Sequence, residues 1–174
     1  MNTYSSRFTL RAVSSIVLLS ASFAIAPAAF AANTLSAGDQ AFVAKVSQGG
    51  MFEVAASKVA VDKAQAQDIK DMANTEVHDH ELVGAKLKKI AGDNGDDFST
   101  DLNAAFTQRV DKLKALSGTA FDAAYTAEMK TIHAADGAAF VKEAKMGQNA
   151  DLKAFAAETA GIVKMHIGAW HAVK

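Results

Sequence analysis

Five acidic or imidazole side chains stand at positions where the helical pattern of this chain predicts buried hydrocarbon. They are Glu53, Glu76, His80, His133 and His166. Such groups are costly to bury unless they are hydrogen-bonded, paired or bound to a metal ion. Imidazole and carboxylate are ligands that zinc, copper and iron accept. The group therefore indicates either a metal site or a buried polar network.

Four long amphipathic segments position these residues, because apolar residues recur in each at alternating steps of three and four. We expect helices over about 39–66, 67–91, 119–146 and 149–173. A turn-forming run at 92–97 and a shorter amphipathic segment, from Ser99 or Thr100 to Ser117 and Gly118, separate the second helix from the third. Gly49 and Gly50 lie inside the first helix, where each costs about 1 kcal/mol relative to Ala, so we expect a neighbouring helix to approach closely there.

Two helical hairpins joined by a long crossover define an all-α, ferritin-like four-helix bundle, with the short extra helix in the crossover. Glu53 precedes a first turn near Ala66 by about as many residues as His80 follows it. His133 and His166 flank a second turn, near Gln148, at similar spacings. Because a helix rises about 1.5 Å per residue, all four side chains are expected near the middle of the bundle.

The first 31 residues have the pattern of a secretory signal peptide. Arg7 and Arg11 precede an apolar run over 12–26, and Ala29-Phe30-Ala31 is a small-residue cleavage site. We expect a short leader over 32–38 and one bundle domain over 39–173. The apolar run is short for a membrane span and no later segment is apolar enough, so the sequence predicts a protein exported to the periplasm with no transmembrane segment in its mature form.

Composition narrows the classes of function. Without the signal the chain carries 16 basic and 19 acidic residues, a net charge of −3 with neutral histidine, which is a poor match to nucleic acid. The chain has no Cys, which excludes disulfides and thiolate metal sites. No Gly-rich phosphate loop and no nucleophile elbow is present, so we identify no catalytic residue and expect no enzyme.

Several segments resemble an exported bacterial family, domain of unknown function 4142. The resemblance is carried by Gln48 to Val54, by the His-Asp-His-Glu run at 78–81, by Leu116-Ser117-Gly118 with Tyr125, and by the run at 152–156. It covers about 39–173 and implies a ferritin-like fold and a periplasmic or outer-membrane-associated location, with no agreed activity. The family's recurrent histidines correspond to His80, His133 and His166, and its first-helix glutamate to Glu53. Met165 stands where the family often has an acid.

The metal hypothesis has to fit the ligand types. Ferritin-like di-iron sites take a Glu-x-x-His pair from each of two helices, whereas here Glu76 and His80 are four apart and His166 has no glutamate three residues before it. Three imidazoles with one or two carboxylates fit zinc, copper or a single iron better. In the alternative, Glu53 and Glu76 hydrogen-bond the histidines in a network that fixes helix register and titrates near neutral pH.

Two hypotheses of function follow from the sequence. The first is a non-enzymatic envelope protein, cofactor-free, that packs against an envelope partner or a second copy and contributes to stress tolerance. The second is a metal-binding or redox protein that uses the five residues named above. Of the nearby polar residues, His78 and Asp79 lie off the apolar stripe and are expected in solvent, and the chain end that carries Trp170 and His171 is expected to fray.

Overall fold

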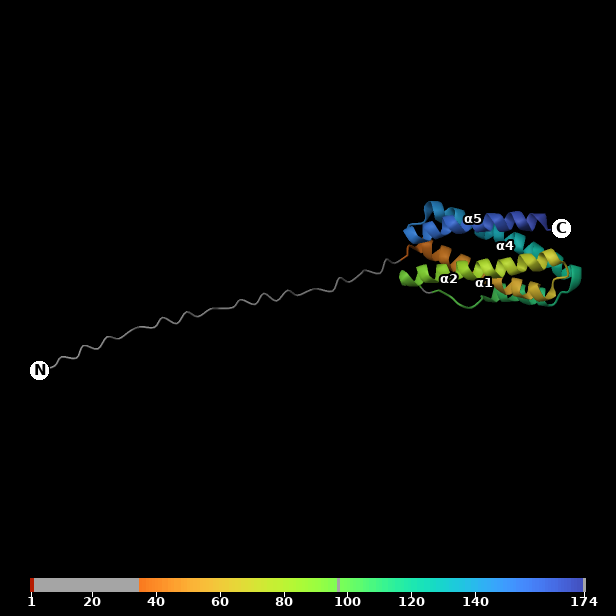
Figure 1. The fold of residues 1–174 in the computed structure, drawn as a ribbon, viewed down its shortest axis with the longest axis horizontal. Helices are drawn as coiled ribbons and strands as arrows, with labels where there is room; N and C mark the ends of the chain where they lie inside the picture. The colour runs from red at the N-terminus through yellow and green to blue at the C-terminus, as the bar shows by residue number, and fades with distance from the viewer. Residues whose placement is uncertain (2–34, 97, 174) are drawn as a thin grey trace. The chain divides into compact units, whose positions relative to one another are not determined.

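The computed structural model describes residues 1, 35–96 and 98–173. The predicted signal peptide over 1–31 and most of the leader over 32–38 lie outside the described residues, so both stay predictions. The described residues contain five helices: α1 (Ala37–Lys63), α2 (Gln67–Asp93), α3 (Ala104–Lys114), α4 (Gly118–Met146) and α5 (Ala150–Ala172) (Figure 1). The all-α prediction is confirmed.

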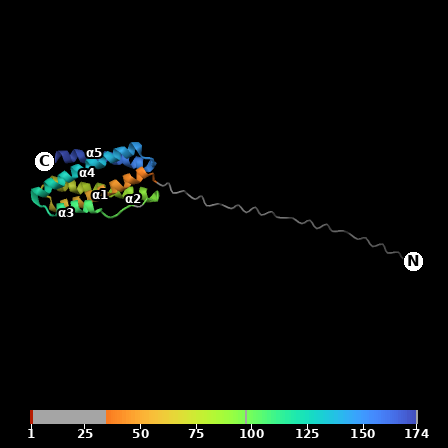
Figure 2. The ribbon, with the colours of Figure 1, turned by 180° about the vertical axis from the view of Figure 1, so that it is seen from behind.

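The four long helices form two hairpins, α1 with α2 and α4 with α5, that pack side by side (Figures 1 and 2). The start of α1 lies beside the turn that follows α4, and the start of α4 lies beside the turn that follows α1. Helices α1 and α4 are therefore antiparallel, and the segment between α2 and α4 has to run the length of the bundle. This is the ferritin-like arrangement, with α3 in the crossover.

The two hairpin turns are held in the same way. Gln65 and Ala66 donate their backbone N–H groups to the two carboxylate oxygens of Asp122, at 2.9 and 3.0 Å. In the second hairpin, Gln148 and Asn149 donate theirs to Asp39, at 2.9 and 3.2 Å. Each aspartate, near the start of one hairpin, thus satisfies the free backbone donors at the turn of the other.

These contacts reveal an internal repeat. A shift of 83 residues takes the acceptor Asp39 to Asp122 and the donors Gln65 and Ala66 to Gln148 and Asn149. The shift superimposes buried positions along both hairpins. The corresponding buried pairs include Phe42 with Tyr125, Val46 with Met129, Glu53 with Asp136, Ile69 with Leu152, Ala73 with Ala156, and Leu87 with Trp170. The bundle is therefore two equivalent hairpins related by an approximate two-fold axis.

The apolar interior is divided into two clusters. One, built around Phe52, Tyr125 and Trp170, lies toward the α1–α2 turn. The other, built around Phe42, Phe140 and Phe155, lies toward the α4–α5 turn. The five ionisable residues singled out in the sequence are all buried and separate the two clusters along the helices. The residues Glu53, Glu76, His80, His133 and His166 are called the Glu/His cluster below.

Helix boundaries differ from the predictions where a side chain intervenes. Helix α1 begins at Ala37 because Ser36 and Asp39 form a reciprocal capping box. The crossover helix begins at Ala104, not at 99 or 100. Asn103 caps it, and Gln48 bonds the backbone at Asp101 and Asn103, which keeps the chain extended before the helix. Among the described residues, no helix combines the length and the apolar composition needed to span a membrane.

Candidate functional site

The Glu/His cluster draws on all four long helices. Glu53 comes from α1, Glu76 and His80 from α2, His133 from α4 and His166 from α5. None of the five is more than 7% exposed, and Glu76 and His133 are fully buried. The predicted meeting of these side chains in the middle of the bundle is confirmed.

One carboxylate oxygen lies at the centre of the cluster. Glu76 Oε2 is 3.0 Å from His80 Nε2, 3.3 Å from His133 Nε2 and 3.2 Å from His166 Nδ1. His133 Nε2 and His166 Nδ1 are themselves 3.2 Å apart. The four atoms all lie within 4.8 Å of one another, so one nitrogen of every imidazole points to a common centre.

The other nitrogen of each imidazole faces a group that accepts hydrogen bonds. His80 Nδ1 lies 3.2 Å from Glu53 Oε2, His133 Nδ1 lies 2.9 Å from the backbone oxygen of Met129, and His166 Nε2 lies 2.9 Å from Asp79 Oδ2. A neutral imidazole has one N–H and one lone pair, and a carbonyl or carboxylate oxygen places the N–H on the outer side. The three lone pairs therefore point inward.

Glu76 is held in the same fashion. Its Oε1 accepts a hydrogen bond from Trp170 Nε1 at 2.6 Å, which leaves Oε2 for the centre. Glu76 Oε2 and His80 Nε2 have no hydrogen-bond partner of good geometry among the described residues. Four acceptor lone pairs that converge in a buried space repel one another unless a cation, either a proton or a metal ion, lies between them.

The shifted pKa values follow from this arrangement. Burial raises the pKa of Glu76, but the close approach of His133, His166 and His80 outweighs burial and holds that pKa far below the usual range. Burial lowers the pKa of His166, yet its contacts with Glu76 and Asp79 leave it above the ordinary value. Burial dominates at His80 and lowers its pKa. Of these two histidines, His166 is therefore the one that favours the charged form, and it faces Glu76.

Glu53 and Asp136 form the edge of the cluster. Burial, with repulsion from Asp136 and Glu76, raises the pKa of Glu53 well above its usual value. Burial likewise raises the pKa of Asp136 to about 6, against the attraction of Lys45. A Cβ atom at Gly49 would stand 1.9 Å from Asp136 Oδ2, so only glycine leaves room for this carboxyl group. The close neighbour predicted for Gly49 is thus a side chain of α4.

The sequence correctly predicted which five residues meet in the cluster, but two predictions about the residues around them were wrong. Asp79 was expected in solvent, yet its carboxylate accepts the outer N–H of His166. Trp170 was expected near a frayed end, yet it is fully buried and bonded to Glu76. His78 is exposed, in agreement with the prediction. No spacing motif in the sequence marks Asp79 as a partner of His166, and the position three residues before Glu76 carries Ala73. Trp170 lies four residues after His166, so the helical repeat places both on the same face of the helix, and this was the one signal for its burial.

Most separations in the donor set match those of a tetrahedral metal site. Ligands about 2.0 to 2.1 Å from a zinc ion are about 3.3 Å from one another in a tetrahedron. Four of the six separations among the donor atoms of Glu76, His80, His133 and His166 run from 3.0 to 3.3 Å, and all six are within 4.8 Å. Glu53 bonds the outer nitrogen of His80 and does not offer an oxygen to this centre. Of the five predicted residues, four can hold a metal ion and Glu53 can orient a ligand.

Fold and site together define a four-helix bundle with a buried centre of three histidines and one glutamate. The chain belongs to the family described as domain of unknown function (DUF4142), whose sequence profile matches residues 24–173. It is also similar in structure to a DUF305 fragment from Deinococcus radiodurans, with a TM-score of 0.70 and 10% identity over 80% of this chain and 96% of that one. At that identity the likeness shows the fold alone. No curated protein matches the sequence.

Proposed function

We propose that this protein binds one divalent transition metal ion, zinc in the first instance, between Glu76, His80, His133 and His166. The observation that carries the proposal is the direction of the imidazole lone pairs. Each outer nitrogen is committed to a carbonyl or carboxylate oxygen, which turns three inner nitrogens and one carboxylate oxygen toward one point. Metal-binding histidines are oriented by acceptors of this kind.

The ligand types favour zinc and a non-enzymatic role. Imidazole nitrogen with one carboxylate oxygen is a donor set that zinc accepts in tetrahedral geometry. Catalytic zinc sites keep one position open for water or substrate, whereas four protein donors close the coordination sphere. The centre therefore stabilises the bundle or stores the ion, and it offers no position at which a substrate is activated.

A metal at this point would also stabilise the fold. Ligands from α2, α4 and α5 would tie both hairpins together, and Glu53 on α1 would join them through His80. We infer that the protein works in the bacterial envelope, as Arg7, Arg11 and the apolar run after them support. An exported domain without Cys gains from a bound ion the kind of cross-link that a disulfide would supply.

A metal-free network is the second candidate, and the position of His166 favours it. Its Nδ1 lies 3.2 Å from Glu76 and its Nε2 lies 2.9 Å from Asp79, so a doubly protonated His166 would donate to both carboxylates. That single proton would replace the metal ion as the central cation. A role in stress tolerance or partner binding rests on this candidate only.

Metal analysis separates the two candidates. The full mature chain is purified from the periplasm without a tag, and its zinc, copper and iron contents are measured. We expect about one zinc ion per chain, and a cobalt-substituted form with the intense visible absorption of tetrahedral Co²⁺. Protein that holds no metal after purification and after incubation with zinc or cobalt, with an unchanged melting temperature in chelator, would overturn the proposal.

Matched variants locate the site. His80→Ala and His133→Ala should weaken zinc binding by about 100-fold or more, and Asp79→Asn by about tenfold to 100-fold because it only orients His166. His78→Ala is the control, since His78 is exposed on the same helix as His80. Equal affinity in His78→Ala and His80→Ala would place the metal elsewhere. Circular dichroism of each variant verifies that the bundle is folded.

A further inference from the structure

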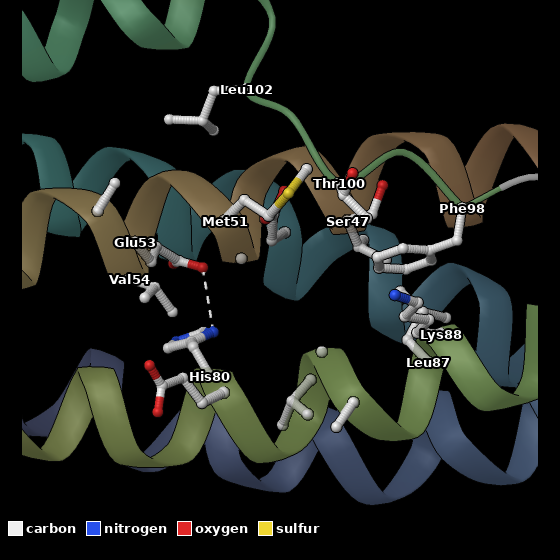
Figure 3. Close-up of a pocket in the computed structure, with 18 of the residues that line it drawn as sticks. Ser47, Met51, Glu53, Val54, His80, Leu87, Lys88, Phe98, Thr100 and Leu102 are labelled. Carbon is white, nitrogen blue, oxygen red and sulfur yellow. Dashed lines mark ion pairs between the residues drawn. The ribbon is translucent and has the colours of Figure 1, made fainter.

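A cavity of about 450 Å³ adjoins the Glu/His cluster on the side of α1 and α2. Figure 3 shows it between these two helices, with the chain from Phe98 to Leu102 passing over it and with Glu53 and His80 at one side. Exposed residues at its border, Lys88 and Thr100 among them, show that it reaches the surface. A cavity of this size is within the range of small-molecule sites.

The internal repeat explains why there is space at this place. Under the 83-residue shift each ligand of the proposed metal centre has a counterpart without a ligand group. The pairs are Glu76 with Thr159, His80 with Val163, His133 with Gly50, and His166 with Val83. Val163, Gly50 and Val83 all line the cavity. The cavity therefore occupies the position that is two-fold equivalent to the centre, in which three imidazoles are replaced by smaller side chains or by none.

Two glycines in the middle of helices keep this space open. Gly50 on α1 and Gly84 on α2 line the cavity, and glycine inside a helix costs about 1 kcal/mol relative to alanine. Among residues 35–96 and 98–173, a Cβ atom at Gly84 would meet no other atom within 4 Å, and one at Gly50 would meet only His80 Nδ1, at 3.9 Å. Neither glycine is needed for close packing of helices, so a larger residue at Gly84 would extend into the free space.

The cavity wall combines a broad apolar surface with one buried polar group. Met51, Val54, Leu87 and Phe98 contribute apolar surface. Glu53 is 2% exposed, and its Oε1 has no hydrogen-bond partner within the described part of the chain. His133 Nδ1 is 3.3 Å away, but the single proton on that nitrogen goes to the backbone oxygen of Met129. A buried carboxyl oxygen without a donor is costly. Oε1 is enclosed in the cavity wall, so a ligand hydroxyl would supply the missing donor after a small rotation of the Glu53 carboxyl group toward the cavity.

We propose that this cavity binds a small uncharged molecule that is mainly apolar and carries one hydroxyl group, which donates a hydrogen bond to Glu53. An apolar cavity of about 150 Å³ holds one benzene molecule, so a cavity about three times larger accepts a ring with a short alkyl chain. The ligand class is therefore that of the alkylphenols. This site adjoins the metal centre and shares His80 with it, but its polar contact, Glu53, is not one of the four metal donors.

Binding of two probes that differ only in the hydroxyl group tests the proposal. The zinc-incubated full mature chain is titrated with 4-pentylphenol and with pentylbenzene, followed by amide chemical shifts in two-dimensional NMR. We expect saturable shifts around α1 and α2, and affinity about tenfold higher for the phenol, as one net hydrogen bond of about 1.4 kcal/mol provides. Absence of saturable binding by both probes would overturn the proposal, and equal affinities would overturn the role of Glu53.

A cavity-filling variant and its matched control locate the binding. Gly84→Met should weaken 4-pentylphenol binding at least tenfold, because its side chain would enter the cavity. Gly161→Met is the control, since Gly161 is also helical, has no described residue within 4 Å of a Cβ atom and does not line the cavity. Gly84→Ala verifies that α2 tolerates a side chain there. Unchanged phenol affinity in folded Gly84→Met would overturn the assignment, whatever its zinc content.

Discussion

The hairpin of α1 and α2 and the hairpin of α4 and α5 are built alike but carry different chemistry. Each has its turn fixed by an aspartate of the other, at positions 39 and 122, and their buried residues correspond along the helices. Yet His133 corresponds to Gly50, and Glu76 to Thr159. The comparison teaches that the framework of the bundle is symmetric, whereas the functional groups are not.

The asymmetry produces one centre and one cavity from two equivalent places. At the first place three imidazoles and a carboxylate converge. At the second, small residues leave about 450 Å³ beside Glu53. Backbone N–H groups satisfy the carboxylates of Asp39 and Asp122, so these need no cation, whereas Glu76 faces lone pairs and does need one. The partners of a buried carboxylate decide its role more than its burial does.

The largest expected effect is at the pair formed by His133 and Gly50. His133→Ala leaves Glu76 and Glu53 with one neighbour fewer in the interior, which should cost about 3 to 5 kcal/mol in the free energy of unfolding. Gly50→Ala at the corresponding position should instead stabilise by up to about 1 kcal/mol, because its Cβ atom has room. Urea unfolding in chelator measures both without a contribution from metal.

This pair of variants can also break the comparison. A His133→Ala protein as stable as the wild type would mean that the cluster contributes nothing to the fold. A loss in Gly50→Ala as large as that in His133→Ala would mean that the two places are equally filled, and the asymmetry between centre and cavity would then be wrong.

The two aspartates should give the next largest effect, and here the hairpins should agree. Asp122→Ala and Asp39→Ala each remove a carboxylate that accepts two backbone N–H groups at a turn, which should cost about 2 to 3 kcal/mol. Asp39→Ala should cost about 1 kcal/mol more, because Asp39 also caps α1 with Ser36. Urea unfolding of the two variants measures the difference, and losses that differ by more than this would contradict the equivalence of the two turns.

The smallest effect concerns Glu143, whose counterpart in the first hairpin is Ala60. Burial and the nearby Asp39 raise the pKa of Glu143 to about 7, against the attraction of Lys142 and Lys153. Because the folded state holds this proton more tightly than the unfolded chain, the stability it contributes is present below about pH 4.5 and is lost as the pH rises through about 7.

Glu143→Gln tests this, since glutamine cannot ionise. At pH 8 the variant should be more stable than the wild type by on the order of 1 kcal/mol, and the advantage should vanish near pH 5. Thermal melts of both proteins across this pH range give the difference in stability between them. Titration of the Glu/His cluster affects both proteins equally and cancels in this difference. A difference that stays constant with pH would show that Glu143 titrates normally.

Much of the fold and of the cluster followed from periodicity. Phe42, Leu87 and Phe140 mark the apolar stripes, and their spacing predicted the four helices and the crossover. The start of the crossover helix was wrong because Gln48, distant in sequence, holds the chain extended before Asn103. Asp79 was misjudged because it lies at the edge of the apolar stripe, where helical phase alone does not tell an exposed side chain from one that reaches a neighbouring helix.

The internal repeat was also hidden in the sequence. Asp39 recurs as Asp122 and Gln65 as Gln148, but most corresponding positions carry different residues. The equivalence became visible only through the hydrogen bonds at the two turns, since a backbone N–H leaves no mark in the sequence.

The amino-acid sequence determined that Glu76, His80, His133 and His166 lie on inward helix faces at similar heights, because a helix repeats every 3.6 residues and rises uniformly. Only the tertiary structure decided which nitrogen of each ring faces the centre. That choice depends on acceptors and donors from other helices or from the preceding turn: Asp79, Glu53, Trp170 and the backbone oxygen of Met129. Periodicity fixes the face on which a side chain lies, whereas its orientation comes from the contacts that folding creates.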